Sequence, residues 1–207
     1  MKRSNVRIAI QKEGRLREAS LKFLKNLGVE VSAGAENSLI APASDNIEII
    51  FVRSGDIPEY IKSSVADFGI IGQNVLREQS SKLKTIKELG FGRCELVIAV
   101  PKKSNIKQVS HLEGERIATS YPSSLRKFLK QNSCSASIVN LQGSVEAAPK
   151  LGLADAICDL TQSGKTLKAN HLRVLSKINS SQAVLVESRH QTSEAQNFIN
   201  QKIENIK

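Results

Sequence analysis

The sequence predicts an α/β protein with mostly parallel sheets, and three observations support this prediction. Short apolar runs alternate with longer amphipathic segments along almost the whole chain, which is the pattern of strand–helix units. Some runs are apolar throughout, such as IEIIFV at residues 47–52, as expected of buried strands. The length of 207 residues suits one large domain or two small lobes.

The first half of the chain begins with an expected strand at residues 6–10, followed by a helix that Gly28 ends. The apolar face of this helix repeats at i, i+3, i+7, i+8 and i+11 and consists of Leu16, Ala19, Phe23, Leu24 and Leu27. Asp56 is expected to cap a short helix that runs to residue 60, with Pro58 in its first turn. Further strands are expected at residues 47–52 and 68–72, and a helix from residue 74.

The pattern of strands and helices restarts after residue 92. A helix is expected to start at Ser123 or Ser124, and another to run from a cap at Ser144 to residue 151, where Gly152 ends it. The last helix is amphipathic, and its apolar face consists of Ala195, Phe198, Ile199 and Ile203. The strands expected in this half lie at residues 94–100, 116–119, 138–141, 154–160, 174–178 and 183–187.

The net charge of +10 comes from basic residues that are spread along the chain. This spacing argues against a nucleic-acid-binding arm, and two Tyr with no Trp provide few stacking platforms for single strands. A positive field also attracts small polyanionic substrates. Composition alone therefore leaves nucleic acids and phosphorylated substrates equally open as ligands.

The cysteines and the N-terminus indicate a cytoplasmic protein. Cys94, Cys134 and Cys158 are odd in number and share no metal-ligand spacing, which fits a reduced setting. The basic N-terminus is not followed by an apolar run of signal-peptide length, and no segment approaches transmembrane length. We therefore expect no membrane partner.

A hydroxyl- and glycine-rich turn follows the expected strand at residues 154–160 and opens another helix. The turn consists of Thr161, Gln162, Ser163, Gly164, Lys165 and Thr166. Such turns bind phosphate through backbone N–H groups and the positive end of the helix dipole. Asp159 stands directly before the turn, where a carboxylate suits sugar hydroxyls or Mg²⁺ better than phosphate. The two features together indicate a phosphorylated ribose as the ligand.

Residues 164–166 also look like the end of a Walker A loop. That motif requires a glycine five residues before Gly164, and Asp159 occupies the position. An aspartate there would repel the phosphates that the loop encloses. A P-loop NTPase is therefore not expected.

Further polar residues gather where the expected strands end. Lys12 and Arg15 follow the first strand, Arg53 and Asp56 follow the second, and residues 119–121 end a later one. In open α/β sheets, ligands bind at this edge. Cationic loops together with a phosphate-binding turn suit a ligand that carries phosphates at both ends.

Six segments, in order along the chain, resemble one known family. Five of them are RIAIQKEGRL (7–16), DIPEYI (56–61), ADFGIIGQNVL (66–76), LGFGRCELVIAVP (89–101) and RIATSYP (116–122). The sixth begins at Glu146, includes Gly152 and Asp159, and ends with SGKTL at residues 163–167. Over nearly its whole length the chain thus resembles ATP phosphoribosyltransferase.

The resemblance implies a glycosyltransferase of the pentosyltransferase class. Its reaction would transfer the phosphoribosyl group of PRPP to N1 of ATP, with Mg²⁺, and release pyrophosphate as the first step of histidine biosynthesis. The implied fold is two-lobed and periplasmic-binding-protein-like (type II), with the active site in a central cleft. Lobe I would comprise residues 1–91 and 173–207, and lobe II, with the PRPP-binding loop, residues 92–172.

The resemblance also implies roles for individual residues. Arg15, Arg53 and Asp159 are the expected catalytic residues, and Asp159 would bind the ribose hydroxyls. Glu146 would assist there or at Mg²⁺, which the substrate phosphates would mainly hold. The loop residues that would bind PRPP are Thr161, Gln162, Ser163, Gly164, Lys165 and Thr166. The residues that would contact ATP or pyrophosphate are Lys12, Arg15, Arg53 and Tyr121.

Some of these assignments have an ordinary structural alternative. Lys12, Arg15 and Arg53 could be solvated loop charges. The helix dipole alone would explain Glu146 in the first turn of a helix. Tyr121, which precedes Pro122, could be only a turn residue.

Longer members of the family carry a third domain at the C-terminus that binds histidine, and this chain ends at Lys207 without one. It therefore resembles the short form, which acts with a regulatory subunit similar to histidyl-tRNA synthetase. We expect a homodimer that ignores histidine by itself and joins that subunit in a hetero-oligomer, without a nucleic-acid partner. The alternative function is a non-catalytic solute-binding module of the same fold. A transcriptional effector domain is a third option, although no helix-turn-helix precedes the first strand.

Overall fold

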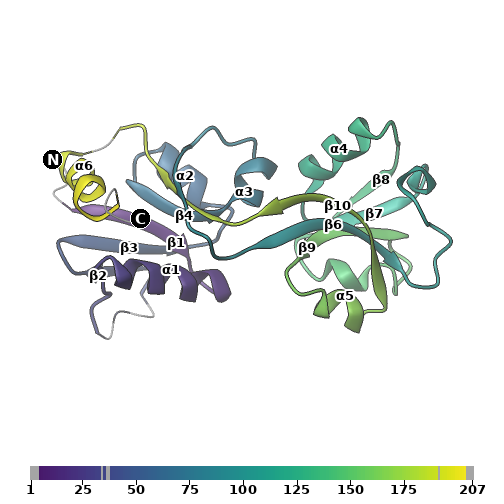
Figure 1. The fold of residues 1–207 in the computed structure, drawn as a ribbon, viewed down its shortest axis with the longest axis horizontal. Helices are drawn as coiled ribbons and strands as arrows, with labels where there is room; N and C mark the ends of the chain where they lie inside the picture. The colour runs from purple at the N-terminus through teal and green to yellow at the C-terminus, as the bar shows by residue number, and fades with distance from the viewer. Residues whose placement is uncertain (1–4, 34, 36–37, 191, 204–207) are drawn as a thin grey trace. The chain divides into compact units, whose positions relative to one another are not determined.

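The computed structural model describes residues 5–33, 35, 38–190 and 192–203. The chain divides into two compact units, and each is built from more than one stretch of the sequence (Figure 1). Unit 1 consists of residues 1–76, 80–92 and 182–207, and unit 2 consists of residues 77–79 and 93–181.

Unit 1 is built on a six-stranded sheet in the order β2-β3-β1-β4-β11-β5. Its strands are β1 (Val6–Gln11), β2 (Ile40–Ala43), β3 (Ile47–Val52), β4 (Phe68–Gly72), β5 (Lys84–Glu88) and β11 (Ala183–Glu187). Strand β1 is parallel to β3 and β4, and the outer pairs are antiparallel. Its helical segments are α1 (Arg15–Asn26), α2 (Ile57–Lys62), the start of α3 (Gln73–Glu78), α6 (Ser193–Phe198) and the π-helical η3 (Ile199–Ile203).

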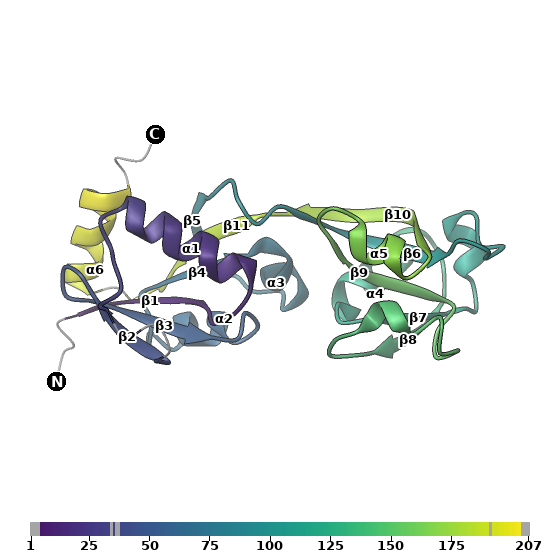
Figure 2. The ribbon, with the colours of Figure 1, turned by 90° about the horizontal axis from the view of Figure 1, so that it is seen from below.

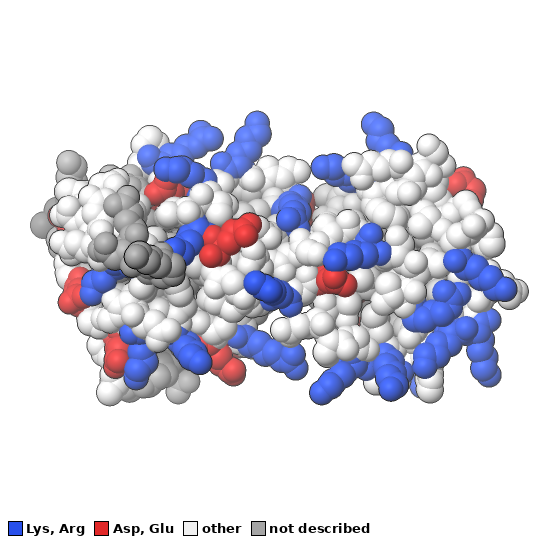
Figure 3. Space-filling model, in the orientation of Figure 1, with Lys and Arg blue, Asp and Glu red and all other residues white. Residues whose placement is uncertain are grey.

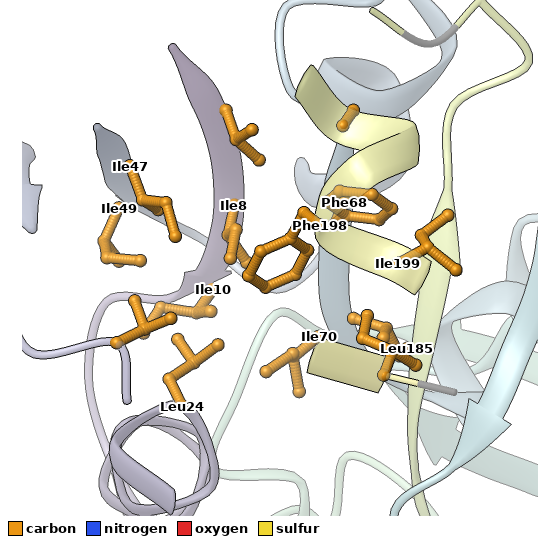
Figure 4. Close-up of a cluster of buried hydrophobic side chains, with 14 of the residues drawn as sticks. Ile8, Ile10, Leu24, Ile47, Ile49, Phe68, Ile70, Leu185, Phe198 and Ile199 are labelled. Atoms are coloured by element: carbon orange, nitrogen blue, oxygen red, sulfur yellow. The ribbon is translucent and has the colours of Figure 1, made fainter. Parts of the chain in front are cut away.

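The two faces of this sheet each bury an apolar core. Alternate strand residues such as Ile8 and Ile10 point toward α1 and α6, where the Phe68 and Phe198 ring centroids lie 5.4 Å apart (Figure 4). Burying one side chain of this size stabilises a fold by about 1.5–3 kcal/mol. On the other face α2 packs closely on β4, because a Cβ at Gly69 would lie only 2.8 Å from Cγ2 of Ile57.

Unit 2 is built on a five-stranded sheet in the order β10-β6-β9-β7-β8 (Figure 2). Its strands are β6 (Cys94–Pro101), β7 (Arg116–Thr119), β8 (Ser137–Asn140), β9 (Ala156–Thr161) and β10 (Leu172–Ser181). Strand β7 is parallel to β8 and β9, whereas β6 is antiparallel to β9 and β10. Its helices are α4 (Pro122–Gln131), α5 (Lys165–Ala169) and the 3-10 turns η1 (Val109–Leu112) and η2 (Val145–Ala147).

The structure confirms the α/β class and nearly all expected elements, but the sheets are mixed. Of the nine strand pairs, four are parallel and five are antiparallel. The prediction of mostly parallel sheets was wrong. Two of the strands that pair antiparallel, β2 and β5, have no apolar run and were therefore not expected from the sequence. Strand β2 is short and contains Pro42, and β5 carries three charged residues in five.

Two helix predictions need correction. The expected helix at residues 144–151 is only the 3-10 turn η2 followed by further turns. Pro149 fits this result, because proline has no N–H to donate to the hydrogen bonds that would continue a helix. Asp56 does precede α2, but its side chain forms no capping hydrogen bond.

The return of the chain to unit 1 falls later than expected. Residues 173–207 were assigned to the first lobe, yet residues 173–181 belong to unit 2. The reason is strand β10, which continues from Leu172 to Ser181 and pairs with β6 along its whole length. Only Val174–Ile178 stood out by apolar character, so its polar end was missed.

One ion pair ties the starts of β7 and β9 together. Arg116 donates from Nε and Nη2 to the two carboxylate oxygens of Asp155, at 3.0 and 2.9 Å, and from Nη1 to the Gly152 carbonyl at 2.9 Å. The Asp155 side chain is 32% exposed. These hydrogen bonds lower the pKa of Asp155 from 3.8 to about 2.

We expect Asp155→Asn to lower the melting temperature at pH 7 and to reduce the acid sensitivity of the fold. A carboxyl group with a lowered pKa stabilises the folded state above its unfolded pKa, and this contribution is lost as the pH falls through the folded pKa. Thermal melts should therefore show a difference between the variant and the parent that shrinks as the pH falls from about 4 toward 2.

The matched control is Asp45→Asn, which removes an ion pair with Lys202 whose carboxylate side chain is 57% exposed. Exposed pairs contribute little to stability, so its effect should be smaller at both pH values. A melting difference for Asp155→Asn that is the same at neutral and acidic pH would contradict the prediction.

Candidate functional site

The expected phosphate-binding turn follows β9 directly and leads into α5. Gly164 adopts the left-handed conformation, with φ 70°, and its N–H donates to Oγ1 of Thr161 at 3.1 Å. Gln162, Ser163, Lys165 and Thr166 are exposed, while Leu167 is buried and anchors the turn to the core. The hydroxyls of Ser163 and Thr166 are thus open to a ligand. Because α5 has only five residues, its dipole adds little, and the turn itself must supply the binding groups.

Strand β9 extends beyond its neighbour β7. The last pair between the two strands is Thr119 with Cys158, whereas the pairing of β9 with β6 continues through Thr161. Asp159 therefore follows the last β7–β9 pair, and three residues of β9 pair on one side only. On this side β9 therefore has no β7 partner from Asp159 to the start of the expected phosphate-binding turn.

Asp159 is partly buried, and one of its carboxylate oxygens accepts a hydrogen bond from the Leu160 N–H at 2.8 Å. Burial raises the pKa of Asp159, and the negative charge of Glu146 raises it further. A carboxylate beside the expected phosphate-binding turn suits a ribose or a hard cation such as Mg²⁺.

Tyr121 lies at the end of β7, just before α4. Its N–H donates to Oγ1 of Thr119 at 2.8 Å, and its side chain packs partly against the hydrophobic cluster between α4 and the sheet. This partial burial is compatible with a purely structural role in the turn and also with a contact to a bound nucleotide. The role of Tyr121 in nucleotide binding stays a prediction.

The remaining reactive groups of this region do not form a nucleophilic site. Cys158 is fully buried, and this burial raises the pKa of its thiol to about 12. In the part of the chain that the structure describes, no group of three or more His, Cys, Asp or Glu residues is arranged to hold a metal ion. Nor is any described helix long and apolar enough to cross a bilayer.

The expected cationic residues Lys12, Arg15 and Arg53 lie in unit 1 and are all exposed. The loops after β1 and β3 adjoin, because the N–H of Lys12 donates to the Val52 carbonyl at 2.9 Å. Lys12 also forms an exposed ion pair with Glu13 at 3.2 Å.

A cavity of about 440 Å³ lies beside Lys12. Arg17 and Phe51 also line it, and neither was expected in a site from the sequence. The guanidinium carbon of Arg17 lies 4.7 Å from the centroid of the Phe51 ring. Stacking of this kind orients a planar cation. The sequence offers no signal for it, because Arg17 and Phe51 come from separate elements.

Positive charge is concentrated in unit 2. Fourteen of the 30 basic residues and seven of the 20 acidic residues fall in this unit, which gives it +7 of the total of +10. Figure 3 shows Lys and Arg side chains gathered over unit 2 on the face in view, with few acidic side chains among them. A field of this sign attracts polyanions.

Comparisons with known proteins agree with these features. A curated ATP phosphoribosyltransferase from Cytophaga hutchinsonii is 45% identical over 180 residues, which are 87% of this chain and 63% of that relative. A chain of the ATP phosphoribosyl transferase (HisG:HisZ) complex from Thermotoga maritima superposes with a TM-score of 0.81 at 32% identity. The match covers 96% of this chain and 97% of that one.

More distant structures share the fold alone. The alkanesulfonate-binding protein SsuA from Xanthomonas axonopodis pv. citri matches with a TM-score of 0.61 at 19% identity, over 97% of this chain and 71% of that one. The two-lobed periplasmic-binding-protein-like fold is thereby confirmed. The family model HisG, ATP phosphoribosyltransferase, matches residues 53–207, about three quarters of the sequence. The chain belongs to the ATP phosphoribosyltransferase family.

Proposed function

We propose that this protein transfers the phosphoribosyl group of PRPP to N1 of ATP and releases pyrophosphate. The observation that carries the proposal is an open hydroxyl and glycine turn directly after the partly buried Asp159. Membership in the ATP phosphoribosyltransferase family supports the same reaction. The chain spans 63% of the length of the Cytophaga relative.

The turn and Asp159 would hold the two ends of the phosphorylated ribose. Backbone N–H groups and the hydroxyls of Thr161, Ser163 and Thr166 would bind the 5′-phosphate, and Asp159 would accept hydrogen bonds from the ribose hydroxyls. Gln162 and Lys165 would complete the phosphate contacts. Fixing both ends of the sugar orients C1 toward the incoming base, and such positioning can contribute a large part of catalysis.

The reaction forms one bond as it breaks another. N1 of adenine attacks C1 of the ribose, while the bond from C1 to the pyrophosphate oxygen breaks and its electron pair leaves with pyrophosphate. Positive charge develops on the ribose and negative charge on the leaving group. Asp159 would stabilise the ribose, and Lys12, Arg15 and Arg53 would neutralise the phosphates of pyrophosphate and ATP. Tyr121 would contact the nucleotide.

Mg²⁺ would supply the remaining charge neutralisation. The residues present fit this ion, because Asp159 and Glu146 supply carboxylate oxygens and Mg²⁺ prefers oxygen ligands. Glu146 would share the ion with the substrate phosphates, which would provide most of its ligands. We also propose a cytoplasmic location, which the three free cysteines favour.

A solute-binding module is the alternative from another class. The fold is common to both functions, as the likeness to an alkanesulfonate-binding protein shows. A binding module does not call for a carboxylate such as Asp159 beside a phosphate-binding turn, whereas the proposed transfer would use it. Turnover therefore separates the two functions.

We expect the purified chain to release pyrophosphate when PRPP, ATP and Mg²⁺ are all present. A coupled assay for pyrophosphate, with each of the three omitted in turn, measures this directly. Binding of PRPP without turnover would favour the solute-binding module. The absence of both turnover and PRPP binding would refute the proposed function.

Asp159→Asn should lower kcat by about 100-fold or more, since it removes charge from the ribose site. The melting temperature at pH 7 should stay the same or rise. Burial raises the pKa of Asp159, so its ionised form destabilises the folded state at pH values above the unfolded pKa.

Asp155→Asn provides the matched control, because Asp155 precedes the same strand and is held by Arg116 at the far end from the turn. It should lower the melting temperature and leave kcat nearly unchanged. An unchanged kcat in Asp159→Asn would remove this residue from the site.

We further propose that the chain forms a homodimer and assembles with a regulatory subunit resembling histidyl-tRNA synthetase. The solved neighbour is a chain of a HisG:HisZ complex, and the match covers nearly all of both chains. Adding histidine to the chain alone should leave pyrophosphate release unchanged, and adding the subunit should confer inhibition. Strong inhibition of the chain alone would contradict this proposal.

A further inference from the structure

Thr119 is the last residue of β7 and is fully buried. Its hydroxyl donates to the carbonyl of Cys158 at 2.7 Å and accepts from the N–H of Tyr121 at 2.8 Å. One side chain thus connects the strand that carries Asp159 with the turn that begins α4. Both partners are main-chain groups, so the hydroxyl fixes backbone positions directly.

The position of this hydroxyl matters because the β7–β9 pairing ends here. Thr119 and Cys158 are the last paired residues, and Asp159 comes next in β9. On the other side of β7, the Leu141 N–H donates to the Thr119 carbonyl at 3.0 Å, and Oγ of Ser120 donates to the Leu141 carbonyl at 2.6 Å. The end of β7 is therefore held firmly by the segment after β8. Through its hydrogen bond to the Cys158 carbonyl, the Thr119 hydroxyl also holds β9 in place.

We propose that Thr119 is a positioning residue for the transfer of the phosphoribosyl group. The inference rests on the proposed function, because it gives Thr119 the task of holding Asp159 where the ribose binds. Thr119 itself touches no substrate in this account. Its hydroxyl fixes the backbone of β9 at Cys158, on the edge where the pairing with β7 ends, and this sets the position of the Asp159 carboxylate.

Removal of the hydroxyl should affect chemistry more than binding. In Thr119→Val the shape of the side chain is kept, but the buried Cys158 carbonyl and Tyr121 N–H lose a shared partner. Such groups shift to find new hydrogen bonds. A displacement of about 1 Å at a reacting group can lower a rate 100-fold, while the exposed turn still reaches the 5′-phosphate.

The test compares Thr119→Val, Thr119→Ser and a control in the pyrophosphate assay. We expect Thr119→Val to lower kcat by about tenfold or more, with KM for PRPP changed by less than about threefold. Thr119→Ser keeps the hydroxyl and should restore most of kcat. Where Thr119→Val does not fold, Thr119→Ala carries the same test, since its smaller side chain leaves room for a water molecule.

Ser188→Ala is the matched control in unit 1. Ser188 is also buried. Its hydroxyl forms a hydrogen bond with the Ser64 hydroxyl at 3.0 Å and accepts a longer one from the His190 N–H at 3.4 Å. It should lower the melting temperature without the loss of kcat.

Two outcomes would overturn the role of Thr119. One is a loss of kcat in Thr119→Val no larger than in Ser188→Ala at a similar loss of melting temperature. The other is a Thr119→Ser variant as slow as Thr119→Val. A wild-type protein that releases no pyrophosphate would instead refute the proposed function itself, so the two failures are distinguishable.

Discussion

The site depends on one feature of the unit 2 sheet, which is that β9 continues for three residues beyond its last pair with β7. Strand β7 ends at Thr119 and turns into α4, while β6 still pairs with β9. The edge of the sheet therefore opens beside Asp159. In the proposed function the ribose would bind at this edge, next to a strand that β6 still holds, and the expected phosphate-binding turn follows that strand.

Asp155, just before β9, and Asp159, within β9, show how the surroundings of a carboxylate can favour either stability or ligand binding. Asp155 is held by Arg116, which lowers its pKa to about 2. Asp159 has Glu146 and burial around it, and both raise its pKa. A carboxylate whose charge is disfavoured in the free protein gains from a ligand that brings hydroxyls or a cation. Such groups concentrate in functional sites, so the contrast supports Asp159 as the functional one of the two.

Local sequence patterns predicted most of the fold, because most elements depend on local signals. Apolar runs identified β3, β4, β6 and β11, and the left-handed Gly28 ends α1 as expected. Strands β2 and β5 were missed since their pairing partners, and not their own residues, make them strands. Mixed sheets follow from the same partners, and the late return to unit 1 follows from the pairing of β10 with β6. Long-range pairing is the information that a single sequence lacks.

In the candidate site, too, residues that are contiguous in the sequence could be predicted, and residues that meet only through strand pairing could not. The turn at residues 161–166 and Asp159 are contiguous, so a motif could find them. Thr119 and Cys158 are 39 residues apart and meet only because β7 and β9 are parallel neighbours in the sheet. No spacing rule connects them, and a threonine at the end of an apolar run is most simply a strand residue. The parallel pairing makes this hydroxyl a link between Asp159 and the rest of the sheet. A site with contiguous ligand-binding residues thus depends on a contact that only the fold creates.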